Sequence, residues 1–101
     1  MPPELVGTWT PTDPAQIGSL VLTPPHQYVF ATPEDSAGGN VVVRGNEIDF
    51  FNAVRCGLSL PAGVGRYTWT LMEGELGFAP LNEDMCGRVS NLRTRKYRKI
   101  P

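Results

Sequence analysis

The stretch Arg66–Ala79 reads RYTWTLMEGELGFA and has the pattern of a β-hairpin. Tyr67, Trp69 and Leu71 fall on one side of an extended strand, and the threonines between them fall on the other side. The pair Glu73-Gly74 then supplies a turn before a second apolar run. This alternation on either side of a turn predicts two neighbouring antiparallel strands.

Similar short runs occupy most of the remaining chain. Most of these runs end at prolines, at glycines or at a two-residue turn signal such as Gly45-Asn46. The 11 glycines and 10 prolines are enough to separate many short strands. The segment Pro33–Asn40, with Gly38-Gly39, is predicted to be a loop. The other predicted strands are Leu5–Thr10, Ser19–Thr23, Gln27–Thr32, Val41–Arg44, Glu47–Phe51 and Arg95–Ile100.

Eight strands with short connections predict an all-β fold, a small eight-stranded antiparallel up-and-down β-barrel. A meander of this kind removes its exposed edges by closing on itself. An OB-fold is the main alternative at this length, but it usually has a helix in mid-chain, which the sequence does not indicate. Only Asp84–Leu92 has helical spacing, so we expect at most one short helix there. The length of 101 residues predicts a single domain over residues 1–101.

Strand parity predicts which side chains point into the barrel. An eight-stranded barrel has an interior just wide enough to be filled by side chains or to hold one small ligand. The predicted inward aromatic side chains either fill this core or line a cavity for a flat apolar molecule, with tyrosine hydroxyls to orient it. These candidate ligand-binding residues are Tyr28, Phe30, Phe50, Tyr67, Trp69 and Phe78.

Several motifs resemble the lipocalin-like branch of the calycin superfamily. Gly7-Thr8-Trp9 resembles the Gly-x-Trp signature of its first barrel strand. Three later segments resemble the G-x-Y-x-W, G-x-L and D-x-C-x-x-R pattern of small bacterial lipocalin-like domains. These segments are Gly65–Trp69, Gly74–Leu76 and Asp84–Arg88. The last match departs from the pattern, because Arg88 follows Cys86 one residue early, and Tyr97 stands where a tryptophan is expected.

The resemblance implies structural roles at one end of the barrel. In lipocalins an arginine packs across the Gly-x-Trp tryptophan and closes the base, which here would place Arg88, Arg95 or Arg98 over Trp9. We therefore assign Trp9 and Arg88 to structure rather than to ligand binding.

The two cysteines, Cys56 and Cys86, are also assigned structural roles. Their spacing does not fit a zinc site, and with one histidine in the chain we expect no metal and no cofactor. A disulfide between them would close a long loop, whereas a reducing compartment would keep both thiols free. The sequence leaves both states open.

Charge and hydropathy limit the partners and the compartment. No apolar run is long enough for a membrane span, and the first residues lack the pattern of a signal peptide, so we expect a cytoplasmic protein, or a secreted one if a leader has been removed. Six of the 9 basic residues follow position 87, where no acidic residue occurs. This basic tail would suit nucleic acid, but neutralisation by the acidic body within the fold is the favoured interpretation. The sequence leaves open whether two barrels pair as a homodimer.

Two functions from different classes follow from the barrel and its aromatic interior. The first is binding of a small hydrophobic or aromatic molecule inside the barrel. The alternative is an enzyme, since barrels of this general shape also serve as cyclases or isomerases in bacterial natural-product pathways. Such a catalyst can hold a flexible substrate in a reactive shape without a nucleophile motif, and the sequence contains no recognisable one.

Overall fold

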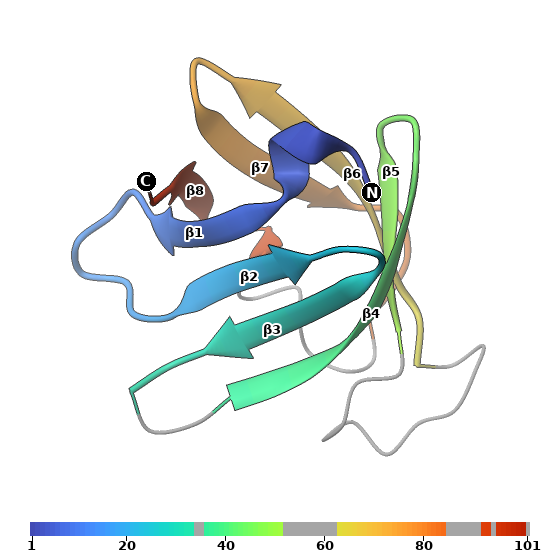
Figure 1. The fold of residues 1–101 in the computed structure, drawn as a ribbon, viewed down its shortest axis with the longest axis horizontal. Helices are drawn as coiled ribbons and strands as arrows, with labels where there is room; N and C mark the ends of the chain where they lie inside the picture. Colours follow the sequence, from blue (N-terminus) through green and yellow to red (C-terminus); the bar gives the residue numbers. More distant parts are fainter. Residues whose placement is uncertain (34–35, 52–62, 85–91, 94, 101) are drawn as a thin grey trace.

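Eight antiparallel strands follow one another around a closed barrel (Figure 1). The computed structural model describes residues 1–33, 36–51, 63–84, 92–93 and 95–100. A single 3-10 turn, η1 (Pro3–Leu5), precedes the first strand. The strands of the described residues are β1 (Gly7–Pro11), β2 (Ser19–Thr23), β3 (Gln27–Ala31), β4 (Ser36–Arg44), β5 (Glu47–Phe51), β6 (Gly65–Met72), β7 (Glu75–Pro80) and β8 (Lys96–Lys99). The predicted all-β, up-and-down barrel is therefore confirmed.

The hairpin predicted at Arg66–Ala79 forms β6 and β7. Its register pairs Trp69 with Phe78 and Leu71 with Leu76, so the apolar side chains of both strands share the inner face. The same alternation around the barrel produces one hydrophobic core. The core residues are Leu5, Trp9, Leu20, Leu22, Tyr28, Val41, Ile48, Phe50, Tyr67, Leu76, Phe78, Leu92 and Tyr97.

Pairing between the first and last strands closes the barrel. Trp9 lies opposite Lys99, and Pro11 lies opposite Tyr97. Beyond these pairs, Thr12 donates its backbone N–H to the Lys96 carbonyl at 2.9 Å. Because β8 also pairs with β7, neither edge of the meander is left open.

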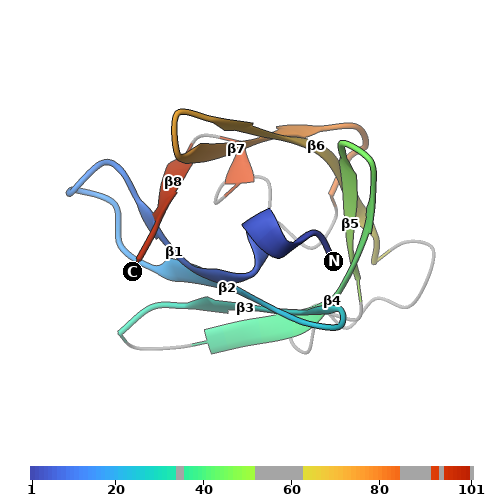
Figure 2. The same cartoon turned by 45° about the horizontal axis from the view of Figure 1, so that its top comes forward.

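One end of the barrel is closed by η1, and we call this end the base. Figure 2 shows η1 across the opening of the ring of strands, and Leu5 in this turn is fully buried. Trp9 donates its indole N–H to the Leu5 carbonyl at 3.0 Å. Lys99 donates to the Glu4 carbonyl at 3.0 Å, and its ammonium lies 5.1 Å from the centre of the Trp9 ring. These contacts fasten η1 to the strands.

The cation that the described residues place over Trp9 is Lys99, and neither Arg95 nor Arg98 takes the position expected of it. Arg98 points to the outer face, where it pairs with Glu75 at 2.9 Å, and Arg95 lies over the Phe30 ring instead. The reason is strand parity, because Lys99 and not Arg98 shares the inward side of β8 with Tyr97. Arg88 lies outside the described residues.

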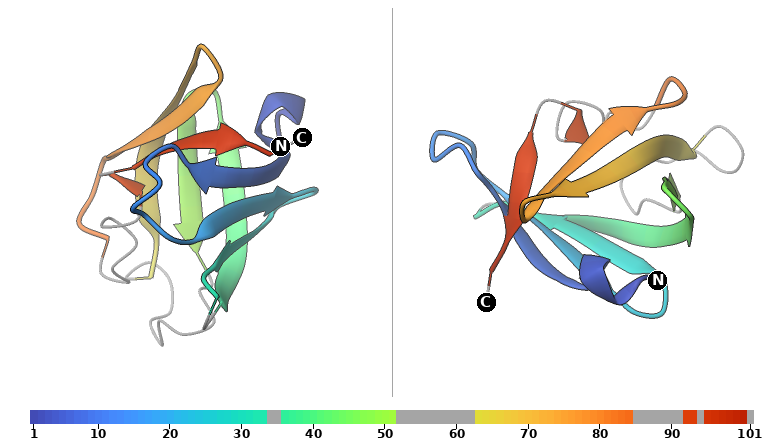
Figure 3. Two further views of the ribbon diagram at one scale, coloured as in Figure 1. Left: turned by 90° about the vertical axis from the view of Figure 1, so that its left-hand side faces the viewer. Right: turned by 90° about the horizontal axis from the view of Figure 1, so that it is seen from above.

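The two ends of the barrel carry connections of different length. At the base, short turns over residues 24–26, 45–46 and 73–74 join the strands. At the opposite end, which we call the rim, the strands are joined through residues 12–18, 32–35, 52–64 and 81–95. The two views of Figure 3 place η1 and both marked termini toward the same end of the barrel. Sequence variation that leaves the strands intact is therefore best accommodated at the rim.

The predicted loop Pro33–Asn40 is wrong over most of its length, because β4 already begins at Ser36. Its glycines are strand residues that allow two strands to approach closely. A Cβ at Gly38 would lie 2.7 Å from the Tyr28 carbonyl oxygen and 3.2 Å from a Val29 methyl. The glycine is therefore needed for close packing within the strand rather than for a turn.

Two further expectations fall on residues that the structure does not describe. The short helix predicted at Asp84–Leu92 lies mostly in residues 85–91. Cys56 and Cys86 also lie outside the described residues, so their disulfide stays untested.

Two glycines inside strands provide a matched test of the close approach. We expect Gly38→Ala to lower the free energy of unfolding by roughly 1–3 kcal/mol, since the new methyl meets fixed backbone. Gly77→Ala should change stability little, because the new methyl would meet only the flexible end of Lys96. Urea denaturation of both variants measures this difference, and equal stability of the two would contradict the explanation given for Gly38.

Candidate functional site: an aromatic cluster facing the rim

Five aromatic rings meet edge to face inside the barrel. Phe50 occupies the centre, with its ring centroid 5.0 Å from that of Tyr28, 5.7 Å from Tyr67 and 6.0 Å from Phe78. Phe78 lies 6.4 Å from Tyr67 and also 6.4 Å from Tyr97. The interplanar angles of 70–85° are those that aromatic quadrupoles favour. We call these five residues the aromatic cluster.

Four of the six predicted ligand-binding residues belong to this cluster: Tyr28, Phe50, Tyr67 and Phe78. Three of them lie at the rim ends of their strands, whereas Tyr28 is near the start of β3, at its base end, and reaches the cluster through its contact with Phe50. Phe50 precedes the last residue of β5, Tyr67 is near the start of β6, and Phe78 is near the end of β7. Because neighbouring strands run in opposite directions, these three positions meet toward the rim.

The other two predicted residues lie elsewhere in the barrel. Trp69 donates its indole N–H to the Gly45 carbonyl at 3.0 Å, which fixes it against a turn at the base. Phe30, near the end of β3, is half-buried and lies at the rim under the guanidinium of Arg95. The six predicted residues therefore do not all lie together in the barrel.

The cluster includes a buried hydroxyl–carboxylate pair. Tyr67 donates its hydroxyl to the Asp84 carboxylate at 2.6 Å, and Asp84 is only 7 % exposed. Asp84 follows β7 at the beginning of the connection over residues 81–95. The bond therefore ties this connection to the inner wall and supplies a charge-assisted hydrogen bond beside Phe50 and Phe78.

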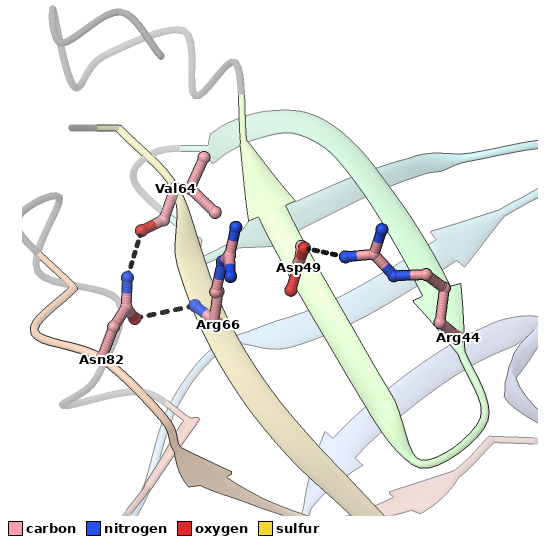
Figure 4. Close-up of polar contacts among 5 residues, drawn as sticks. All are labelled: Arg44, Asp49, Val64, Arg66 and Asn82. Carbon is pink, nitrogen blue, oxygen red and sulfur yellow. Dashed lines mark hydrogen bonds and ion pairs between the residues drawn. The ribbon is translucent and has the colours of Figure 1, made fainter. Parts of the chain in front are cut away.

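Asn82 holds the same connection against the start of β6 (Figure 4). Its side-chain oxygen accepts the Arg66 backbone N–H at 2.8 Å, and its amide nitrogen donates to the Val64 carbonyl at 2.9 Å. Leu81 adds a backbone bond to the Arg66 carbonyl at 2.7 Å. The side chain thereby takes over the pairing with β6 where the ladder ends at Pro80, a residue without an N–H.

A charge pair beside this region lies on the outer wall and is separate from the site. Arg44 donates to the Asp49 carboxylate at 2.8 Å (Figure 4). Parity places Asp49 on the outward side of β5, yet the residue is only 8 % exposed. The pair joins β4 to β5 where Asp49 lies opposite Val42 and Arg66.

A second polar pair, formed by Arg95 and Tyr97, lies at the start of β8. Tyr97 has no exposed surface, and its burial raises the pKa of its phenol to about 12 against the opposing effects of the Arg95 charge and hydrogen bond. Arg95, Tyr97 and Lys99 alternate along this end of the chain, so they share one parity from the rim to the base. Sequence reasoning did not use this alternation, although it would have added Tyr97 to the inner wall.

Other chemistry-bearing groups lie away from the cluster. His26 is exposed and borders a small outer groove of about 200 Å³ near the base. Within the residues that the structure describes, no three His, Cys, Asp or Glu side chains gather as a metal site. No helix formed by those residues is long and apolar enough to cross a membrane.

Comparison of the chain with protein-family models, curated protein sequences and solved structures returned no match. The site is therefore interpreted from its own geometry. That geometry consists of five packed rings, a Tyr67–Asp84 pair and an Arg95–Tyr97 pair, placed where the strands reach the rim.

The raised pKa of Tyr97 predicts an alkaline loss of stability. The unfolded chain releases the phenol proton near pH 10, whereas the folded protein keeps it until about pH 12, so stability falls as pH rises between these values. Tyr97→Phe should remove this contribution and flatten the decline. Denaturation at fixed pH values from 9 to 12 measures it, and an unchanged slope in the variant would contradict the assignment.

Proposed function

We propose that this barrel binds a small apolar or aromatic molecule at its rim, against the aromatic cluster. The supporting observation is the placement of aromatic and polar side chains together at the end opposite the sealed base. Ligand sites combine mostly apolar walls with a few placed polar groups, which is the composition found here. Phe30, which is half-buried at the rim, offers contact area, and the two polar pairs offer orientation.

We further propose that the chain is a small lipocalin-like domain of the calycin superfamily. Three features support this assignment. The meander has eight strands, a 3-10 turn closes one end, and the Gly-x-Trp tryptophan is fixed there beneath a cation. This proposal rests on architecture and motif, and it carries no statement about the identity of the ligand.

Binding is tested with a panel of polycyclic aromatic and acyl probes. We expect saturable binding with chemical-shift changes confined to rim residues of β5 to β8, because the base is closed by η1. Amide-resolved NMR is preferred to tryptophan fluorescence, since both tryptophans are fixed toward the base. Phe78→Leu should weaken binding about tenfold, consistent with the loss of an aromatic contact of about 1 kcal/mol or more.

Met72→Ala provides the control for Phe78→Leu. Met72 is 71 % exposed on the outer face, so its truncation should leave probe affinity unchanged. The absence of saturable binding across the whole panel, or shifts confined to the base, would overturn the proposal.

The second candidate function is catalysis of ring formation or isomerisation. The observation favouring it is the 2.6 Å bond between Tyr67 and Asp84, which places a hydroxyl and a carboxylate in an aromatic environment. Such a pair can accept or return a proton while the surrounding rings hold a polyene or polyketide in a folded shape.

Substitution of the hydroxyl separates this function from simple binding. Tyr67→Phe should lower turnover of a cyclisable polyene or polyketide roughly a hundredfold or more if Tyr67 transfers a proton. Thr68→Val, at the neighbouring outward position, should leave turnover unchanged. Circular dichroism checks that both variants fold, and equal turnover in Tyr67→Phe and the unsubstituted protein would reject the catalytic role.

A further inference from the structure

Arg95 is a half-buried cation at the rim, directly before β8. Its guanidinium lies 5.8 Å from the centre of the Phe30 ring, and Nη1 donates to the Ile17 carbonyl at 2.6 Å. It also hydrogen-bonds the Tyr97 hydroxyl. One side chain thus connects the solvent-facing rim to the buried Tyr97 of β8.

The acceptors around this guanidinium are neutral. Its contacts are a backbone carbonyl, a phenol and an aromatic ring, and no carboxylate within the described part of the chain pairs with it. Two other arginines among the described residues do pair with carboxylates, Arg44 with Asp49 and Arg98 with Glu75. Charged acceptors bind guanidinium about twice as strongly as neutral ones and fit its two parallel donors.

The Ile17 carbonyl that accepts from Arg95 belongs to the connection over residues 12–18, which makes few other hydrogen bonds to the described part of the barrel. In the connection over residues 12–18, the Arg95 bond is the only side-chain hydrogen bond that the described residues show to another part of the barrel. Ile17 is 63 % exposed. A stronger acceptor can therefore replace the Ile17 carbonyl without unfolding a strand.

Phe30 and Gly18 complete this corner of the rim. Gly18 has a φ of +110°, and a Cβ there would lie 2.7 Å from the tip of the Phe30 ring. The tip of the Phe30 ring therefore packs closely against Gly18, and the guanidinium lies over the ring. An apolar wall thus lies within reach of the same cation.

From this arrangement we infer that the molecule bound at the rim carries a carboxylate, which pairs with Arg95 in place of the Ile17 carbonyl. The inference rests on the proposed binding function and deepens it by naming the ligand class, an aromatic or apolar carboxylic acid. The acid group meets Arg95, and the apolar part lies against Phe30.

A matched pair of probes tests this inference: a naphthoic acid and the naphthyl methanol of the same skeleton. Calorimetry should show the acid binding the unsubstituted protein about tenfold to a hundredfold more tightly, as expected for hydrogen bonds to a charged group. Arg95→Gln should abolish this preference and leave affinity for the alcohol within about twofold. Arg93→Gln, which removes a nearby exposed cation, should keep the preference.

Two measurements guard against a variant that simply misfolds. In the unsubstituted protein, added salt should weaken binding of the acid but not of the alcohol. Saturation with the acid should speed amide hydrogen exchange at Gly18 and Ser19, because the Ile17 carbonyl is released. The alcohol should not have this effect.

The outcomes separate the inference from the function on which it rests. Equal affinity of the unsubstituted protein for both probes, or an acid preference that survives Arg95→Gln, overturns the carboxylate assignment while binding stands. If neither probe binds the unsubstituted protein, the proposed binding function fails and the carboxylate assignment fails with it.

Discussion

The pairing of β1 with β8 is the constraint on which the rest of this structure depends. β8 spans only Lys96–Lys99, yet it joins the end of the meander to its beginning and to β7. Its inward residues complete both ends of the interior, since Tyr97 joins the aromatic cluster and Lys99 covers Trp9. An open sheet would leave the first and last strands unpaired and expose these side chains. The core is therefore created by closure, and no single hairpin contains it.

Most strands were predictable because the information needed for them is local. Alternation along short runs that are separated by turn residues located the hairpin of β6 and β7 and the hairpin of β4 and β5. The pair Gly38-Gly39 was misassigned because glycine serves turns and close strand contacts equally well. The two roles are distinguished by the Tyr28 carbonyl oxygen, which would lie 2.7 Å from a Cβ at Gly38. Tyr28 belongs to β3, so the sequence around Gly38 carries no sign of this contact.

The site was predictable in part for the same reason. Parity identified Phe50, Tyr67 and Phe78 as inward residues, but it carries no information about which end of the barrel a side chain reaches. Trp69 shares the parity of Tyr67 and nonetheless lies toward the base. Asp84 lies beyond the last residue of β7, where alternation no longer applies, so its bond to Tyr67 required the folded connection.

The position of both termini at the base has a consequence for how this barrel can be joined to other structures. Ile100 donates its backbone N–H to the Thr8 carbonyl at 2.8 Å, and Lys99 reaches the Glu4 carbonyl, so the last strand ends beside the segment that leads into β1. A fusion partner, an affinity tag or a surface tether added at either terminus leaves the molecule on the side opposite the rim. Because both termini lie at the same end, a linker peptide that crosses the base can join them covalently, and new ends can then be opened in a rim connection without cutting a strand.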